Sequence, residues 1–503
     1  MEACLKRNSI ACYHKVYSQI LRREELQDAI IPDRLPDLAS VLTVSGCVLI
    51  RSKDVSAGRV RLEANVPARL SYYAEDGSIC CLDVNIPFYV SAEDPAIPDG
   101  GNCVAGLHLA ELDAKVLNPR KVSVHASVSV TLECYQAGET EFLSAPEEGA
   151  CPIHAQERSA EITVVQAMTE KTFVLTDEVI LPAGKTAMEE LLGYDVVLTV
   201  EDRKSLGSKL LLKGSAKSRI LYRGPEMEVD TAEFSTAFSQ MVDLDCGESE
   251  PFMEVQMLVS GLYYDIAPGY DGRTVKMELH AAAQVRMLCN MPVRYLADAY
   301  SNSYELALRR ENREIICCRQ ETGLHGTLRL QMELPQEICE LGSCAAQVTD
   351  VSAEGGDTAV QVALQLLCRG TDGRFLTLTR EGKLMLHGEF AENERLLIGA
   401  ATVEDASAAL DSGCAEIRVD VELTGISAAY GALECISGIE YDENAARDLS
   451  GEPSVVIMRV RNGDDLWRIA RENCSTVEAI EQANDLDWSG STWEKLVLIP
   501  RAE

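Results

Sequence analysis

The sequence predicts a mainly β protein: three tandem β-sandwich-like domains followed by a small βααβ module. Apolar and polar residues alternate with a period of two over long stretches, which is typical of a sheet with one buried face. These stretches recur in three similar units, and the first two align at a shift of 153 residues, from Arg120 to Arg273. A shift of this size is that of a domain rather than a solenoid repeat.

A short proline-containing segment opens each unit. Residues 31–42 begin Ile-Pro-Asp-Arg-Leu-Pro-Asp-Leu, residues 181–192 begin Leu-Pro, and residues 334–338 carry a fainter third copy. Repeated openings of this kind indicate tandem copies of one structural unit. Before the first opening, residues 1–29 are predicted to form an N-terminal helical segment.

Two strands joined by a turn follow each opening. The turns are rich in Gly, Asp and Pro, which break strands. The predicted strand pairs are Gly58–Tyr73 and Ile79–Val90 around residues 75–77, Ser208–Tyr222 and Val229–Phe238 around residues 224–225, and Thr358–Cys368 and Phe375–Leu384 around residues 371–373.

A long alternating strand closes each unit: Arg120–Tyr135, Arg273–Leu288 and Ala415–Thr424. The period of two places its apolar residues on one face, which we expect to be buried. These residues are Val122, Val124, Val128 and Val130 in the first unit, Val275, Met277, Leu279 and Val285 in the second, and Ile417, Val419, Val421 and Leu423 in the third.

The resulting β domains are predicted at residues 30–140, 165–292 and 293–440. Residues 137–170 and 441–453 look like connecting segments, because both are rich in polar residues, glycine and proline. The second segment is predicted to be a linker that lets the C-terminal module move independently.

The C-terminal module, residues 454–501, reads as strand, helix, helix, strand. Gly463-Asp464 ends the first strand with a residue suited to cap a helix. Residues 475–478 have the spacing of a capping box with Ser475 at its start. The second helix is predicted to end near Asn484, a residue that tolerates the left-handed conformation.

Over its whole length this module resembles a LysM domain, a family that binds N-acetylglucosamine polymers in a shallow groove between two loops. The resemblance implies that the groove also serves as the binding site here. Trp467 is expected to be a partly buried core residue, whereas Trp488 and Trp493 could stack on a sugar or anchor a protein interface. The implied groove and rim residues are Gly463, Asp464, Asp465, Leu466, Trp467, Asn484, Asp485, Leu486, Asp487, Trp488 and Trp493.

The three β units resemble the SPOCS domain of clostridial sporulation proteins, and the domain order resembles that of clostridial spore coat morphogenetic proteins. This resemblance implies a non-enzymatic adaptor in the mother-cell cytoplasm at the forespore surface. Its implied partner, bound through the LysM domain, is the ATP-hydrolysing coat scaffold called stage IV sporulation protein A. The alternative is a peptidoglycan-binding or chitin-like-glycan-binding protein of the spore or cell envelope.

Composition restricts the partners and the compartment. The net charge of -34 repels phosphate backbones and anionic membranes, so we exclude nucleic acid as the main partner. The N-terminus has no apolar core of signal-peptide length, and no apolar run is long enough to span a bilayer. The 18 cysteines lack a regular spacing and are expected to be mostly reduced and buried, with cross-linking in the mature coat as the alternative.

No motif favours an enzyme, and no cofactor is predicted. Gly184-Lys185-Thr186 resembles the end of a phosphate-binding loop, but Val179 stands where the loop needs glycine, so the triplet is predicted to be a turn. Cys151 and His154 have metal-like spacing without a second ligand pair, and the seven histidines are isolated from one another. We therefore predict neither catalytic nor metal-binding residues.

Overall fold

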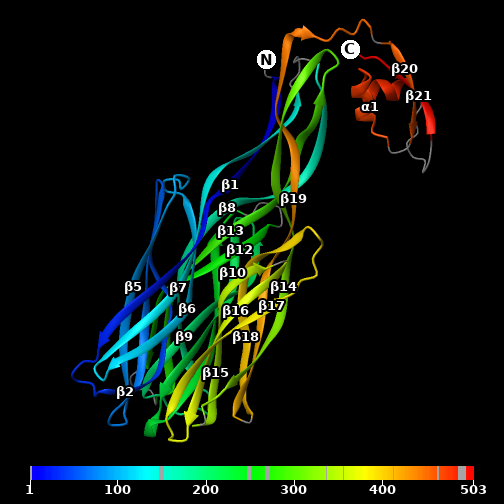
Figure 1. The fold of residues 1–503 in the computed structure, drawn as a ribbon. Coiled ribbons are helices and arrows are strands. Elements are labelled where there is room, and N and C mark those ends of the chain that lie inside the picture. Colours follow the sequence, from blue (N-terminus) through cyan, green and yellow to red (C-terminus); the bar gives the residue numbers. More distant parts are fainter. Residues whose placement is uncertain are drawn as a thin grey trace.

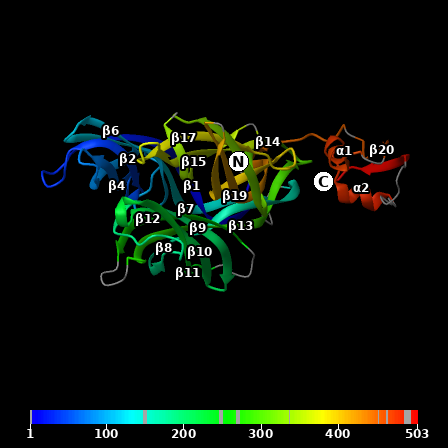
Figure 2. The same ribbon diagram turned by 90° about the horizontal axis from the view of Figure 1, so that it is seen from below.

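The computed structural model describes residues 3–146, 152–245, 251–266, 272–335, 337–354, 356–411, 413–451, 453–461, 464–484 and 494–502. The chain forms three similar β units and a C-terminal βααβ module (Figure 1). Seen from below, the three units lie side by side and the module lies at one end of the molecule (Figure 2). The predicted mainly β class is therefore confirmed.

Each unit pairs a sheet of long strands with a sheet of shorter strands. Unit 1 contains β1 (Leu5–Ile30), β2 (Leu38–Gly46), β3 (Leu49–Ser56), β4 (Arg59–Ala74), β5 (Ile79–Glu93), β6 (Asn102–Asn118) and β7 (Lys121–Pro146). Unit 2 contains β8 (His154–Ile180), β9 (Glu190–Leu206), β10 (Lys209–Arg223), a 3-10 turn (Pro225–Met227), β11 (Val229–Asp243), β12 (Phe252–Ile266) and β13 (Thr274–Tyr300). Unit 3 contains β14 (Tyr304–Glu333), β15 (Ile338–Glu354), β16 (Asp357–Gly370), β17 (Phe375–Leu386), β18 (Glu394–Asp411) and β19 (Cys414–Ala446).

The long sheet of each unit has its closing strand in the centre, in the orders β1-β7-β6, β8-β13-β12 and β14-β19-β18. The first two long sheets join into one six-stranded sheet through the pair Tyr13 and Val165. The short sheets have the orders β2-β4-β3 with β5 beside β4, β11-β10-β9, and β15-β16-β17. All three predicted strand pairs are confirmed, as β4-β5, β10-β11 and β16-β17.

The predicted buried faces are also confirmed. Val122, Val124, Val128 and Val130 of β7 are fully buried, in one cluster with residues of β4 and β5. The corresponding residues of β13 and β19 are no more than 3% exposed. The cores therefore lie between the long and short sheets, as in a sandwich.

The helix predicted over residues 1–29 is wrong. Residues 5–30 form strand β1, which pairs antiparallel with β7 along its whole length, from Leu5 opposite Pro146 to Ile30 opposite Lys121. The partner strand β7 follows more than 90 residues later in the chain. The conformation of residues 5–30 therefore depends on long-range pairing, which no local sequence pattern reveals. Each unit thus begins with the strand before its proline opening, and the units span residues 5–146, 154–300 and 304–446.

The predicted connecting segments are shorter than expected. Most of residues 137–170 belong to β7 and β8, and residues 147–151 lie outside the described part. Strand β19 continues to Ala446, so only about the second half of the segment 441–453 connects it to the C-terminal module.

The long strands extend beyond the sandwiches as three two-stranded ribbons (Figure 1). We call them the ribbon bundle: residues 5–15 with 135–146, 154–165 with 288–300, and 304–318 with 428–446. All three ribbons contribute to one apolar cluster, which includes Phe142, Tyr295 and Leu433. A second cluster, with Leu296 and Ile439, lies further along the bundle. The ribbons therefore hold the three units together by burial of apolar side chains.

A charged network joins units 1 and 2. The Arg286 guanidinium on β13 pairs with the carboxylates of Glu133 on β7 and of Glu254 on β12, the latter at 2.7 Å. Lys15 on β1 lies 3.1 Å from Glu133. Burial raises the pKa of Glu133, but Arg286 and Lys15 outweigh this effect and hold it below its usual value.

All cysteines in the described part of the chain are free, and more than half are buried. Burial raises the pKa of the Cys47 thiol to about 12 and that of Cys344 to about 11. The thiolate is the reactive form, so these two groups are poor nucleophiles near neutral pH.

We expect Glu133→Gln to lower the free energy of unfolding by roughly 1–3 kcal/mol at neutral pH, because Arg286 loses one of its buried counterions. Since the folded-state pKa of Glu133 is depressed, its stabilisation is present above the ordinary value of 4.5 and is lost as pH falls through the folded-state pKa. Melting temperatures of the two proteins should therefore differ at neutral pH and converge near pH 3 or below.

The exposed residue Glu93, which lies 3.9 Å from Arg59, provides the matched control Glu93→Gln. This substitution should change stability by less than about 0.5 kcal/mol, as is usual for exposed pairs. Equal effects of the two substitutions would contradict a joining role for the charged network.

Candidate functional site

The C-terminal module consists of β20 (Val455–Arg461), α1 (Leu466–Glu472), α2 (Val477–Ala483) and β21 (Glu494–Pro500). The predicted βααβ order is confirmed. Strands β20 and β21 pair antiparallel, from Val455 opposite Pro500 to Arg461 opposite Glu494. Six of the eleven predicted groove residues lie outside the described residues, so the groove itself is not placed: Gly463, Asp485, Leu486, Asp487, Trp488 and Trp493.

Two of the predicted groove residues hold the start of α1. The Asp465 carboxylate caps the helix by accepting a 3.0 Å hydrogen bond from the Trp467 backbone N–H. Asp464, which the sequence suggested as the cap, instead accepts from the Arg461 N–H at 2.8 Å and closes the turn after β20. Each carboxylate therefore satisfies a backbone donor, a local role common to short acidic side chains.

Helix α2 is capped by Thr476, not by Ser475 as predicted. The Thr476 hydroxyl accepts from the Ala479 N–H at 3.0 Å, whereas the buried Ser475 hydroxyl donates to the Pro500 carbonyl at 2.5 Å. Ser475 lies one residue before the position from which a hydroxyl can reach the first turn. It therefore joins the loop between the helices to β21.

Asn484 ends α2, as predicted, but its backbone is extended (φ -137°) rather than left-handed. Its side-chain amide donates to the Leu498 carbonyl at 2.6 Å and to the Ile480 carbonyl at 2.7 Å. Its side-chain oxygen accepts from the Leu498 N–H at 2.8 Å. Asn484 thus links α2 to β21, and these structural bonds already occupy its amide.

Trp467 and Leu466 pack against the core of the module, and both are partly buried, as expected for Trp467. Trp467 also contacts the body of the protein. Its ring lies edge-on to that of Tyr300, with centroids 4.8 Å apart, and its indole N–H donates to Asp298 at 2.9 Å. Trp467 is therefore a contact between the module and the ribbon bundle.

Asp298 is the centre of this contact. One carboxylate oxygen accepts from Trp467 and from Arg471 of α1, each at 2.9 Å, and the other accepts from Arg310 of β14 at 2.7 Å. Only 14% of its side chain is exposed. One donor from unit 3 and two from the module thus converge on one carboxylate of unit 2, and hydrogen bonds to a charged group are among the strongest in proteins.

Tyr300 and Asn302 complete the contact. The buried Tyr300 hydroxyl donates to the Ser475 carbonyl at 2.9 Å, and burial raises its pKa to about 12. The Asn302 amide donates to the carbonyls of Ser475 and Ala502. The expectation that the linker lets the module move independently is therefore wrong for this structure, in which the module is docked on the ribbon bundle.

The outer face of the β20–β21 sheet, which lies opposite the helices, is apolar and exposed. We call it the module face: Val455, Ile457, Arg459, Arg461, Leu496 and Leu498. Its aliphatic side chains are 42–69% exposed, while Val460 and Val497, which point to the helices, are fully buried. Ile457 lies directly opposite Leu498, and Arg459 lies opposite Leu496. An exposed apolar sheet face rimmed by arginines is typical of a protein-binding surface.

The residues weighed for catalysis have local partners. The Lys185 ammonium lies 2.7 Å from the Asp230 carboxylate, in a turn as predicted. His125 and His280 lie on strands and contact Glu24 and Glu278. The His154 ring packs against that of Tyr300 at a tilt of 42°, while Cys151 lies outside the described residues.

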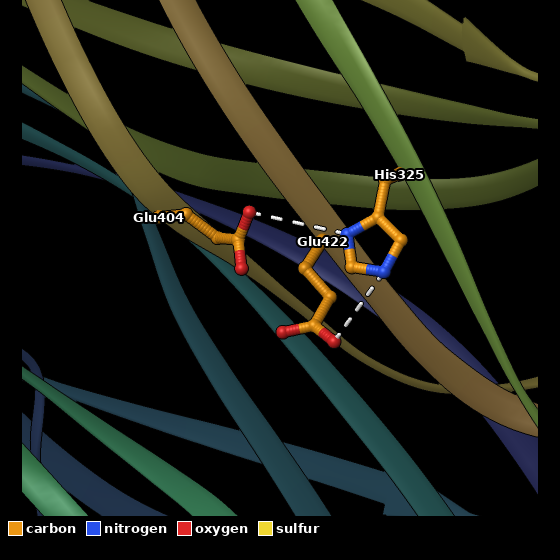
Figure 3. A group of neighbouring side chains, drawn as sticks. All are labelled: His325, Glu404 and Glu422. Carbon is orange, nitrogen blue, oxygen red and sulfur yellow. Dashed lines mark ion pairs between the residues drawn. The ribbon is translucent and has the colours of Figure 1, made fainter.

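The structure brings together one group that the sequence did not reveal. His325 of β14, Glu404 of β18 and Glu422 of β19 gather on the outer surface of the long sheet of unit 3 (Figure 3). The imidazole nitrogens lie 3.9 Å from one oxygen of each carboxylate. These residues are up to 97 positions apart, from 325 to 422, so no sequence spacing could have indicated the group.

Two pockets lined by residues of units 1 and 2 are small and have no such group of residues. One, of about 260 Å³, lies between units 1 and 2 beside Lys53 and Gln284. The other, of about 270 Å³, lies beside Arg69 and Tyr264. The Lys53 ammonium donates to Glu170 at 2.7 Å and to Gln284 at 2.8 Å, so the first pocket marks a joint between the units.

No protein-family model, curated protein or solved structure matches the chain. In the described part of the chain, neither helix is long and apolar enough to cross a bilayer.

We expect Asp298→Ala to release the docked module, because it removes the common acceptor of Trp467, Arg471 and Arg310. Hydrogen bonds to a charged group contribute roughly 1.5–3 kcal/mol each, so proteolytic cleavage between residues 447 and 454 should accelerate at least about tenfold. Small-angle scattering should also show a larger maximum dimension.

Asp243→Ala is the matched control, because Asp243 is an exposed carboxylate that lies 3.6 Å from Lys209 in unit 2. It should leave both measurements unchanged. Cleavage and scattering equal to wild type in Asp298→Ala would show that this carboxylate does not hold the module.

Proposed function

We propose that the chain is a SipL-like spore coat morphogenetic adaptor, with three SPOCS domains followed by a LysM domain. In this proposal it is not an enzyme. It acts in the cytoplasm of the mother cell, where its LysM domain binds the ATP-hydrolysing coat scaffold, stage IV sporulation protein A. The three β units then tether the coat to the forespore surface.

The exposed module face carries this proposal. Val455, Ile457, Leu496 and Leu498 expose contiguous aliphatic side chains, which gain free energy when a partner removes them from water. They offer neither aromatic rings nor hydrogen-bonding groups to a sugar.

The shape of the molecule supports the role of a tether. Units 1 to 3 share the ribbon bundle, and the module is fixed on that bundle through Asp298 and Tyr300. A partner bound to the module face would therefore be held at one end of a long β body (Figure 1). Preorganisation of this kind lowers the entropic cost of assembly.

We expect Ile457→Asp and Leu498→Asp, each in the full-length chain, to weaken capture of the coat scaffold by roughly 30-fold. Truncation or charging of a central interface anchor typically costs about 2 kcal/mol or more. Leu206→Asp is the matched control, because Leu206 is a 44% exposed leucine of unit 2 that lies outside the module. Affinity is measured by biolayer interferometry with purified scaffold.

Scaffold capture and glycan retention together distinguish the two kinds of partner. Trp488→Ala and Trp493→Ala should also weaken capture of the scaffold. Capture by the wild type should fall as salt rises, because salt screens the charges of both partners. Retention on peptidoglycan and on chitin should be low for all variants. Micromolar binding of peptidoglycan by the wild-type chain, without capture of the scaffold, would replace the adaptor with the glycan-binding protein.

A further inference from the structure

We propose that His325, Glu404 and Glu422 form a binding site for one divalent transition-metal ion of the Zn²⁺ class. The three side chains come from three neighbouring strands, β14, β18 and β19, and their ligating atoms lie within 4.8 Å of one another (Figure 3). An imidazole and two carboxylates form a ligand set that suits Zn²⁺, whereas Ca²⁺ and Mg²⁺ prefer sets made of oxygen alone. This site is independent of the proposed adaptor function.

The strand register explains how the group forms. His325 lies directly opposite Glu422 in the β14–β19 ladder, so their side chains are neighbours on the same face. On the other side, Val403 and Asp405 of β18 pair with Val421 and Asp420, which leaves Glu404 as the extra residue of a β-bulge. A bulge redirects a side chain, and here it brings Glu404 to the imidazole.

The same bulge recurs in all three units at the same register. In unit 1 the extra residue is Ala110 of β6, which lies between the pairs Leu109–Val128 and Glu111–Ser127. In unit 2 it is Ser260 of β12, which lies between the pairs Val259–Ala281 and Gly261–His280. The bulge is therefore part of the fold, but only unit 3 places a carboxylate on it.

The positions of His325 and Glu422 also carry different residues in units 1 and 2. The cross-strand pair that corresponds to His325 and Glu422 is Arg22 with Ser129 in unit 1 and Thr172 with Ala282 in unit 2. Two units thus fold without any metal-binding side chain at these three positions. The shared backbone therefore does not fix the side chains at these positions, which leaves His325, Glu404 and Glu422 available to bind a ligand in unit 3.

The charge of the group favours a cation. Among the residues that the structure describes, the ion pairs of Glu404 and Glu422 are with His325 alone, at 3.9 Å, whereas Arg418 on the same strand neutralises the nearby Asp420 at 3.0 Å. Two carboxylates therefore share one imidazole in a chain of net charge -34. A divalent ion between them would supply the missing positive charge.

The geometry can close on an ion with small movements. Bonds of 2.0–2.2 Å in a tetrahedral zinc site place the ligating atoms roughly 3.4 Å apart. The ligating atoms lie up to 4.8 Å apart, so the side chains must close by roughly 1.4 Å, and the imidazole must turn one nitrogen toward both carboxylates. The side chains of His325 and Glu404 are 62% and 49% exposed, and the terminal torsion of glutamate rotates freely, which allows this movement.

Gly323 leaves room for a fourth ligand. It precedes His325 by two residues on β14 and so lies on the same face. A Cβ atom at this position would lie 3.7 Å from His325 Nε2 and 3.9 Å from a carboxylate oxygen of Glu422. Because glycine has no side chain there, a water molecule can complete the tetrahedron beside three protein ligands.

Isothermal titration of the full-length reduced protein with Zn²⁺ tests the proposal. We expect the wild type to bind one more Zn²⁺ than Glu404→Gln/Glu422→Gln, with His325→Ala at least about tenfold weaker, since loss of even an outer-shell partner weakens metal binding by about 10–100-fold. Every variant keeps the same cysteines, so zinc bound to thiolates is common to all and cancels in the comparison.

Glu416→Gln is the matched control, because Glu416 is an exposed carboxylate on the same face of β19. It should bind zinc like the wild type. Zinc should also raise the melting temperature of the wild type and of the control, but not that of the double variant, while all three melt alike without metal. Equal zinc stoichiometry, affinity and thermal shift in the wild type and the double variant would overturn the proposal.

Discussion

The pairing of the first strand of each unit with its last strand is the constraint on which the rest of the structure depends. In unit 1, β1 follows β7 from Leu5 opposite Pro146 to Ile30 opposite Lys121. The corresponding pairs β8–β13 and β14–β19 are slightly longer. One half of each pair belongs to a sandwich, whose apolar face is buried by the shorter sheet, and the other half forms a ribbon that packs on the other two ribbons. A single type of ladder thus builds the core of each unit and also joins the units.

The ribbon bundle also positions the C-terminal module. Asp298 and Tyr300 lie at the end of β13, where the ladder ends and their side chains face α1 and the loop after it. Without the ribbon, the carboxylate of Asp298 would not meet Trp467, Arg471 and Arg310 together. The docking engages the helices and leaves the opposite face of β20–β21 exposed. The long strands therefore decide which surface of the module a partner can reach.

The three units share one backbone design but differ in the chemistry of their surfaces. The β-bulge before the closing strand recurs in each unit, at Ala110, Ser260 and Glu404. In unit 3 alone it brings a carboxylate to His325 and Glu422. Comparison of the three units therefore distinguishes two kinds of residue. Those that all units share serve folding, whereas the titratable side chains found in unit 3 alone are available for binding.

The sequence by itself determined the β class, the three repeats, the strand pairs and the βααβ order, because periods of two and 3.6 residues and the turns between them are local properties. It also determined which face of β7 is buried, through Val122 to Val130. The tertiary structure alone decided the conformation of residues 5–30, which pair with β7 although a helical segment was predicted for residues 1–29. It also decided the role of Trp467, the docking on Asp298 and the meeting of His325 with two glutamates. Each of these depends on residues far apart in the chain, and only the register of long antiparallel ladders brings them together.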